Sequence, residues 1–313
     1  MAGLVLFIPQ TLMTLLSVHK QGVIMTTTTR TSQTVSEALG SELVTDGGFA
    51  AVTATNSYTS DFSVGTDSFT ATNGAVAGNI DTIGGENDWL RLTIDAAASY
   101  HRAERAMGFT ANQTVRVRFK YFIPSTNSHV DGIRLSFNSA DSIDGVVLDA
   151  ATSVDYYITA GTTDLNFYML DGGVYSPIED AGADDVFYIK DIILDVITFT
   201  SWTAGTGWAP QATAGALTGK AVKVAGTASD LEQDVSAVAT NVYRVVHTAT
   251  RTAGSETAEV GGTDGAARST AATFTDNIRA ATTGNLKIGA DASFAGTIDA
   301  VSCKQITRRA APD

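Results

Sequence analysis

A strict alternation of apolar and polar residues marks the segment from Thr114 to Ile123. Every second side chain there is β-branched or aromatic, and Arg116, Arg118 and Lys120 lie between them. A period of two with apolar residues on one side predicts an antiparallel strand that is buried on one face. The predicted inward positions are Val115, Val117, Phe119, Tyr121 and Ile123.

Similar short runs recur along the chain, separated by clusters of Gly, Asn, Asp and Ser. Ile133, Leu135 and Phe137, for example, follow the turn residues Asp131 and Gly132. Many short strands at regular spacing predict a β-sandwich or jelly roll. Only Gln33–Leu39 has a pattern that suits a helix, and it is short. We therefore expect an all-β protein.

The chain also repeats itself, which indicates a duplicated module. Several pairs of similar segments occur in the same order in both halves. They are Phe62–Thr66 with Trp202–Thr206, Thr72–Gly78 with Thr213–Gly219, Leu90–Leu92 with Val222–Val224, Ala103–Arg105 with Leu231–Gln233, Val115–Val117 with Tyr243–Val245, Leu165–Phe167 with Leu286–Ile288, and Ile189–Ile197 with Ile298–Ile306.

The repeat predicts two tandem jelly-roll or β-sandwich domains preceded by an extended N-terminal arm. A chain of 313 residues is long enough for two cores. The first domain is longer because of insertions, one of them at Asn79–Asp88. The predicted parts are the arm 1–40, a first domain 41–197, a second domain 198–307 and a tail 308–313.

The N-terminal arm is apolar from Leu4 to Leu16. That run is shorter than the roughly 20 residues of a membrane-spanning helix, and Pro9 interrupts it. It has no basic segment before it and no clear cleavage site, so it is a poor signal peptide. Either residues 1–24 are an extended start before Met25, or the arm docks on a partner. The residues expected to bind that partner are Leu4, Leu6, Phe7, Ile8, Leu12, Leu15 and Leu16.

The net charge limits the kinds of binding partner, and the cysteine content limits the covalent cross-links. The net charge is −13, from 33 acidic and 20 basic residues, and no Lys/Arg-rich stripe offsets it. Such a surface repels phosphate backbones, so we expect no nucleic-acid binding, and no membrane segment is expected either. Cys303 is the only cysteine, which excludes an intrachain disulfide and favours a buried, inert thiol.

The sequence carries no recognisable catalytic motif. The four histidines are scattered without metal-ligand spacing, and no nucleophile elbow, P-loop or dinucleotide fingerprint occurs. His247 takes the position of Phe119 in the repeat, which predicts a packed histidine, whereas His101 is expected on a solvated charged face. We therefore expect a protein that is not an enzyme.

The segment Glu42–Phe49, ELVTDGGF, resembles the opening strand of carbohydrate-binding-module-like jelly rolls. Val186–Ile193 and Gly296–Ser302 resemble the closing strand of the same modules, which also occur repeatedly in bacteriophage virion proteins. The resemblance covers about residues 41–306 and implies concave jelly-roll units. In sugar-binding members, aromatic side chains on the concave face stack on the ligand.

The resemblance also suggests site residues. The aromatic candidates for glycan stacking are Trp89, Tyr100, Tyr121 and Tyr168, with core packing as the alternative. Some members hold a structural calcium between the first and last strands, and Asp46 and Asp191 stand at matching positions. No other cofactor is expected.

These expectations support a structural protein on the surface of a bacteriophage virion, made in the host cytoplasm. It would be a capsid decoration or head fibre protein that binds the major capsid protein or another virion protein through the N-terminal arm and first domain. We expect a homo-oligomer, a dimer or trimer. The alternative is a carbohydrate-binding adhesin or tail-fibre module that recognises host surface glycans.

Overall fold

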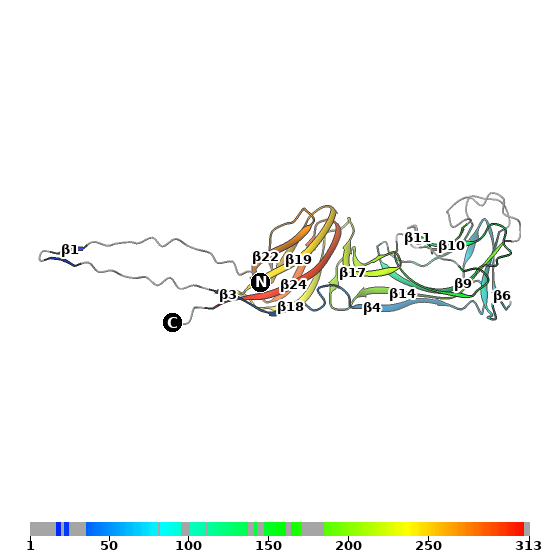
Figure 1. The fold of residues 1–313 in the computed structure, drawn as a ribbon, viewed down its shortest axis with the longest axis horizontal. Helices are drawn as coiled ribbons and strands as arrows, with labels where there is room; N and C mark the ends of the chain where they lie inside the picture. The colour runs from blue at the N-terminus through cyan, green and yellow to red at the C-terminus, as the bar shows by residue number, and fades with distance from the viewer. Residues whose placement is uncertain are drawn as a thin grey trace. The chain divides into compact units, whose positions relative to one another are not determined.

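The computed structural model describes residues 17–19, 22–24, 36–80, 82–94, 101–110, 112–136, 141–142, 147–160, 164–170 and 185–309. All regular elements in these ranges are β-strands (Figure 1), so the all-β prediction is confirmed. The expected short helix is wrong where it is described, because Ser36–Leu39 lies in strand β3 (Ser36–Glu42). Among the described residues, no helix is long and apolar enough to cross a membrane.

The chain divides into two units. One unit comprises residues 1–38 and 308–313, and within it β1 (Ser17–His19) pairs with the antiparallel β2 (Gly22–Ile24). The seven apolar arm residues expected to bind a partner lie outside the described residues. The other unit, Leu39–Thr307, contains two β-sandwiches.

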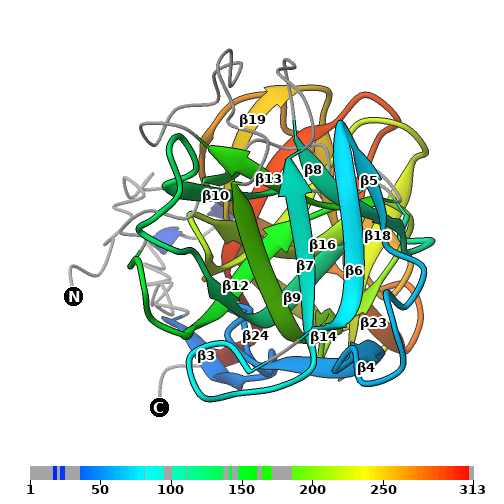
Figure 2. The ribbon, with the colours of Figure 1, turned by 90° about the vertical axis from the view of Figure 1, so that its right-hand side faces the viewer.

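The first sandwich packs a five-stranded sheet against a six-stranded sheet (Figure 2). Its core is built from alternate residues of both sheets, among them Phe119, Phe167 and Leu194. The five-stranded sheet has the order β11 (Asp141–Ser142), β10 (Gly132–Ser136), β13 (Asp164–Leu170), β8 (Arg102–Ala106), β5 (Thr70–Thr72). The six-stranded sheet has the order β12 (Thr152–Thr159), β9 (Thr114–Phe122), β14 (Val186–Phe199), β7 (Trp89–Ile94), β6 (Gly74–Ile80), and β4 (Val52–Ser60) also pairs with β14.

The second sandwich repeats this order strand for strand. Its five-stranded sheet runs β21 (Thr263–Asp264), β20 (Glu256–Val260), β23 (Gly284–Ala290), β18 (Ser229–Ala237), β15 (Thr203–Ala204). Its six-stranded sheet runs β22 (Ala272–Arg279), β19 (Val242–Ala253), β24 (Ala295–Arg309), β17 (Ala216–Lys223), β16 (Trp208–Thr213), and β3 also pairs with β24. The duplication predicted from the sequence is therefore confirmed.

The two copies also share their register, residue by residue. Leu194 lies opposite Val117 in the first copy, and Cys303 lies opposite Val245 in the second. The closing strands β14 and β24 each bulge at the same place, where Asp191 and Ala300 adopt φ angles of 53° and 52°. The matches at Ala103–Arg105, Val115–Val117, Leu165–Phe167 and Ile189–Ile197 agree with these registers.

The opening segment Glu42–Phe49 belongs to the second sandwich and not to the first. Val44 and Phe49 lie in the second core, and the carbonyl of Gly47 accepts a 2.8 Å hydrogen bond from the N–H of Val301. The first sandwich, β4 to β14, is thus inserted between β3 and β15 of the second. The expected boundaries differ from this arrangement because residues 41–51 precede the first sandwich.

Three of the equivalences drawn from the sequence change in the structure. Phe62 packs on Phe69 at 5.7 Å between ring centroids, and Phe49 packs on Trp202 at 5.2 Å. Phe49 is therefore the counterpart of Phe62, and both have a positive φ, 49° and 59°. The match of Leu90–Leu92 moves by one residue, to Ala221–Lys223. The match of Thr72–Gly78 with Thr213–Gly219 is wrong, since β6 corresponds to β16.

The second core contains a polar pair where the first is apolar. His247 takes the place of Phe119, as predicted, and Glu256 takes the place of Ile133. Both side chains are buried, and His247 Nε2 lies 2.8 Å from Glu256 Oε1. His101, expected on a solvated face, is buried as well.

We predict that Phe49→Ala destabilises the second sandwich by about 3–5 kcal/mol, because it leaves a cavity in that core. The first sandwich, although it follows Phe49 directly in the chain, is expected to keep its stability. Hydrogen exchange checks this: amides of β19 and β24 should lose protection, and those of β9 and β14 should not. Loss of protection in β9 and β14 instead would contradict the nested arrangement.

A second prediction concerns the buried pair. His247→Phe alone leaves the Glu256 carboxyl buried without its partner, which costs about 3–5 kcal/mol. The double variant His247→Phe/Glu256→Ile installs the residues of the first copy and is expected to be about as stable as the parent, or more stable. Urea unfolding of the three proteins measures the difference. A double variant as unstable as the single one would show that packing volume, and not polar pairing, governs this position.

Candidate functional site

The outward face of the five-stranded sheet in the first sandwich presents an aromatic ring between two arginines. Leu135, Phe167 and Ala103 point into the core, so their neighbours along each strand point away from it. The register aligns Arg134 of β10, Tyr168 of β13 and Arg102 of β8 in one row. We call this row the Tyr168 platform.

Hydrogen bonds hold the platform in place. Arg102 Nη1 donates to the hydroxyl of Tyr168 at 3.0 Å, and the guanidinium carbon lies 5.5 Å from the ring centroid. Arg102 Nη2 also pairs with Glu104 at 2.8 Å, and Glu104 accepts a 2.8 Å hydrogen bond from Thr72. A partly exposed ring with cationic donors beside it is suited to stack on an apolar ring face and bind its polar edge.

The same face of the second sandwich lacks this row. Gly289 occupies the place of Tyr168, with Asp230 and Thr257 in the places of Arg102 and Arg134. A hollow of about 330 Å³ lies there, and its lining includes Asp230, Glu259, Asp264 and Asp291. At this equivalent position, the first copy therefore has a large aromatic side chain flanked by basic residues, and the second has a glycine with acidic side chains nearby.

Two of the other aromatic candidates, Tyr121 and Trp89, are less accessible than Tyr168. Tyr121 is 1% exposed, belongs to the first core and accepts a 3.0 Å hydrogen bond from the N–H of Val147. Trp89 is fully buried, although it lies outside the core between the sheets. Tyr100 lies outside the described residues. The sequence named Tyr168 but missed Arg102 and Arg134, because only the register shows that they flank it.

The two aspartates suggested for calcium do not come together. Asp46 lies in the opening segment of the second sandwich, where its carboxylate accepts the N–H groups of Ala50 and Ala51 at 2.8 and 2.9 Å. Asp191 lies in the bulge of β14 in the first sandwich, 3.4 Å from Lys120 Nζ. In the part of the chain that the structure describes, no group of three or more His, Cys, Asp or Glu residues could hold a metal ion. Asp46 and Asp191 therefore belong to different sandwiches and do not form one shared site.

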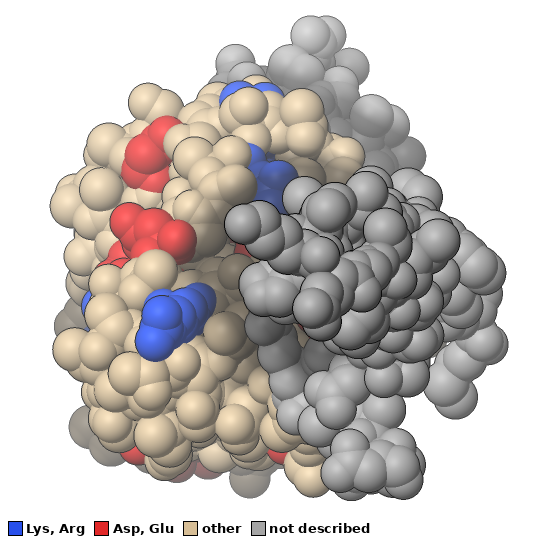
Figure 3. All heavy atoms as spheres, turned by 90° about the vertical axis from the view of Figure 1, so that its left-hand side faces the viewer, with Lys and Arg blue, Asp and Glu red and all other residues tan. Residues whose placement is uncertain are grey.

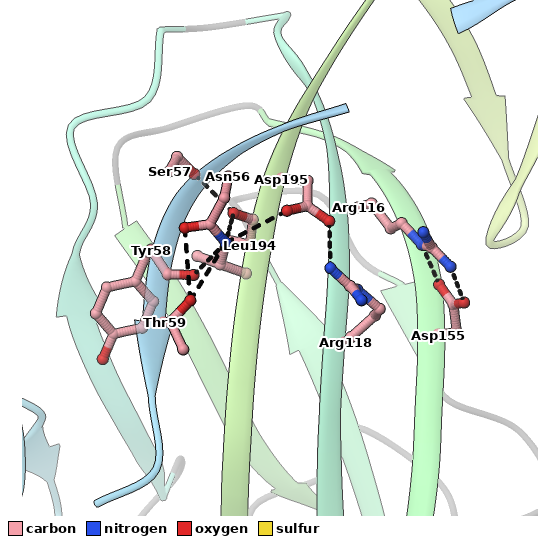
Figure 4. Close-up of polar contacts among 9 residues, drawn as sticks. All are labelled: Asn56, Ser57, Tyr58, Thr59, Arg116, Arg118, Asp155, Leu194 and Asp195. Atoms are coloured by element: carbon pink, nitrogen blue, oxygen red, sulfur yellow. Dashed lines mark hydrogen bonds and ion pairs between the residues drawn. The ribbon is translucent and has the colours of Figure 1, made fainter. Parts of the chain in front are cut away.

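The outward face of the six-stranded sheet in the first sandwich carries paired charges (Figure 4). Arg116 Nε donates to Asp155 at 2.7 Å, and Arg118 pairs with Asp195 at 2.6 Å. The hydrogen bond from Arg116 is the main cause that keeps the pKa of Asp155 below its ordinary value. Because these charges neutralise one another, this face offers little net attraction to a charged ligand.

Charged side chains are also dispersed on another face of the molecule. In Figure 3, basic and acidic residues lie among a majority of neutral ones, and no broad blue patch covers the described surface in this view. This distribution agrees with the overall acidic charge of −13.

No protein-family model matches the chain, and no curated protein matches its sequence. Solved structures are similar in fold. They include the tandem CBM22-1-CBM22-2 domain of Xyn10C from Paenibacillus barcinonensis, at 10% identity and a TM-score of 0.37, covering 82% of this chain and 99% of the other. The tandem CBM51 modules of Sp3GH98, a family 98 glycoside hydrolase from Streptococcus pneumoniae SP3-BS71, cover the same shares at 10% identity and a TM-score of 0.26.

A viral protein is also similar in fold. A chain of Sulfolobus Turreted Icosahedral Virus matches at 11% identity and a TM-score of 0.21, over 66% of this chain and 56% of the other. All three likenesses concern the fold alone. The chain consists of two β-sandwich domains in tandem.

Proposed function

We propose that this chain is a carbohydrate-binding protein without enzymatic activity, and that the Tyr168 platform holds a saccharide. The observation that supports it is the row Arg102–Tyr168–Arg134 across three adjacent strands. The C–H groups of a pyranose ring pack on the aromatic ring, while its hydroxyl groups accept hydrogen bonds from guanidinium groups. In this proposal the protein binds the saccharide without making or breaking a covalent bond.

The comparison between the two copies favours the first sandwich as the binding module. Both copies build the same sheet with the same register, so the fold itself does not require an aromatic residue at this position. The second copy has Gly289 there and presents acidic side chains around a hollow. We propose that the second sandwich carries the first, which is inserted into its chain between β3 and β15. In this proposal the second sandwich does not itself stack on sugars.

We predict that Tyr168→Ala abolishes glycan binding by the full chain. Loss of one aromatic stacking contact lowers affinity by about ten- to hundredfold, which takes a weak module below detection on a glycan array. Tyr157→Ala is the matched control, because Arg116 lies 5.6 Å from the Tyr157 ring on the other sheet in a similar cation–π pair.

The control should bind like the parent, and both variants should keep the far-ultraviolet circular dichroism of the parent. A Tyr168→Ala protein that still binds the same glycans at the same strength would remove the Tyr168 platform from the proposal. A correctly folded parent without any signal on the array would remove glycan binding itself.

We propose that the biological setting is the surface of a bacteriophage virion. The acidic, Thr- and Gly-rich composition suits a protein displayed in many copies, and two sandwich modules in one chain suit attachment and projection. In this setting the chain would be a homo-oligomeric capsid decoration or head fibre protein that contacts the major capsid protein. Mass spectrometry of purified virions is expected to find its peptides, and their absence from intact particles would exclude this setting.

A further inference from the structure

A second aromatic cluster lies on the outward face of the other sheet of the first sandwich. Trp89, Phe122 and Tyr188 come from β7, β9 and β14, next to inward-facing residues of the core. Their ring centroids are 6.1 to 6.5 Å apart. Trp89 is completely buried and Tyr188 is 8% exposed, although they project away from the core.

A short turn covers this cluster. Ile83 and Glu86 exchange two backbone hydrogen bonds of 2.8 and 3.0 Å, with Gly84 and Gly85 between them at φ angles of 59° and 85°. A Cβ atom placed on Gly84 would lie 3.6 Å from the ring of Phe122, so the turn rests on that ring. The indole N–H of Trp89 donates to the carbonyl of Glu86 at 2.9 Å.

Ion pairs fasten the turn to the sheet. The Glu86 carboxylate lies 2.8 Å from Lys120 Nζ and 3.2 Å from Lys190 Nζ, and Lys190 also donates to the carbonyl of Asn87 at 2.8 Å. Asp191 also lies 3.4 Å from Lys120. The hydrogen bond from Lys120 is the main cause that lowers the pKa of Glu86. Since Glu86 is one-third exposed, such pairs hold the turn only weakly.

The second copy shows that the fold does not need this cluster. Thr250 and Thr297 occupy the places of Phe122 and Tyr188, and their hydroxyl oxygens are 2.6 Å apart. The strands β16 and β17, which correspond to β6 and β7, are joined by Ala214 and Gly215 alone. The aromatic cluster and the turn that covers it therefore occur together, and only in the first copy.

A polar donor stands beside the aromatic rings. Arg91 lies opposite Tyr188 in the register of β7 and β14. Its Nε atom is buried and has no hydrogen-bond partner among the described residues. An unpaired buried donor costs free energy unless a ligand or water satisfies it.

We propose that the Ile83–Glu86 turn is a displaceable cover over a second saccharide site, in which one ring of the edge-to-face cluster Trp89, Phe122 and Tyr188 stacks on a sugar ring and Arg91 binds a hydroxyl group. This site is separate from the Tyr168 platform, on the opposite sheet, and does not depend on it. The ion pairs of Glu86, the hydrogen bond from Trp89 and the contact of Gly84 with Phe122 together keep the cover closed in the free protein, and a saccharide displaces it.

The test removes the charge that fastens the cover. Glu86→Gln keeps the size of the side chain, and Asp155→Asn is the matched control, because it breaks an ion pair on the same sheet away from the cluster. Quenching of tryptophan fluorescence by acrylamide measures access to Trp89. We expect the quenching constant to rise about two- to fivefold in Glu86→Gln and to stay unchanged in Asp155→Asn.

Two further measurements show whether the change in quenching comes from Trp89. In the Trp89→Phe background, Glu86→Gln should leave quenching of the remaining tryptophans, Trp202 and Trp208, unchanged. In the unsubstituted protein, quenching should rise with sodium chloride concentration as the ion pairs are screened. Equal quenching in the parent and in Glu86→Gln would overturn the proposal of a latched cover, and so would an equal rise in Asp155→Asn.

Saccharide binding is tested separately from the Tyr168 platform. On a glycan array, Tyr168→Ala/Glu86→Gln is expected to give a signal, whereas Tyr168→Ala alone, with the cover held closed, gives none. The difference should disappear when Phe122→Thr and Tyr188→Thr, the residues of the second copy, are added. An array on which Tyr168→Ala/Glu86→Gln gives no signal overturns this site, whatever Tyr168 itself does.

Discussion

The register of the long closing strands is the constraint on which every assignment depends. In β14 and β24, a shift of one residue would exchange core and surface for the whole strand. Antiparallel pairing with β9 and β19 fixes that register, and the shared bulge at Asp191 and Ala300 resets it at the same point in both copies. The pairing thus decides that Phe119 packs in the core while Phe122 projects outward.

The two copies differ in what their surfaces carry and not in how they fold. Side chains that could stack on a ring, Tyr168 and the Trp89 cluster, belong to the first sandwich. The second has Gly289 and a pair of threonines at the corresponding positions. It also has a buried His247–Glu256 pair, whose desolvation makes it a costly way to fill a core. Because β3 belongs to the second sandwich, the chain passes between the two modules twice, once before β4 and once after β14.

The sequence predicted what depends on local pattern. The alternation from Thr114 to Ile123 placed Tyr121 inward, and the structure finds it in the core, so the same pattern argued against Tyr121 as a ligand residue. The repeat placed His247 where Phe119 lies, which the register confirms. The position of Tyr121 follows from side-chain periodicity, and that of His247 follows from the internal repeat.

What the sequence could not predict depends on contacts between distant segments. Phe49 precedes the first sandwich, yet it packs in the second, so a collinear comparison matched Phe62 with Trp202 instead. Residue type could not distinguish Trp89, an outward ring beneath a turn, from an exposed ring or a core ring. Arg102 and Arg134 are far apart in the chain, and only strand pairing brings them to either side of Tyr168.

A saccharide that binds the Tyr168 platform contacts the outward five-stranded sheet of the first sandwich and not that of the second. Hydrogen-exchange mass spectrometry of the full chain, with and without the glycan that binds best on an array, tests it most directly. We expect slower exchange in β8, β10 and β13 and no change in β18, β20 and β23. Protection confined to the second sandwich, or absent from β13, would contradict it.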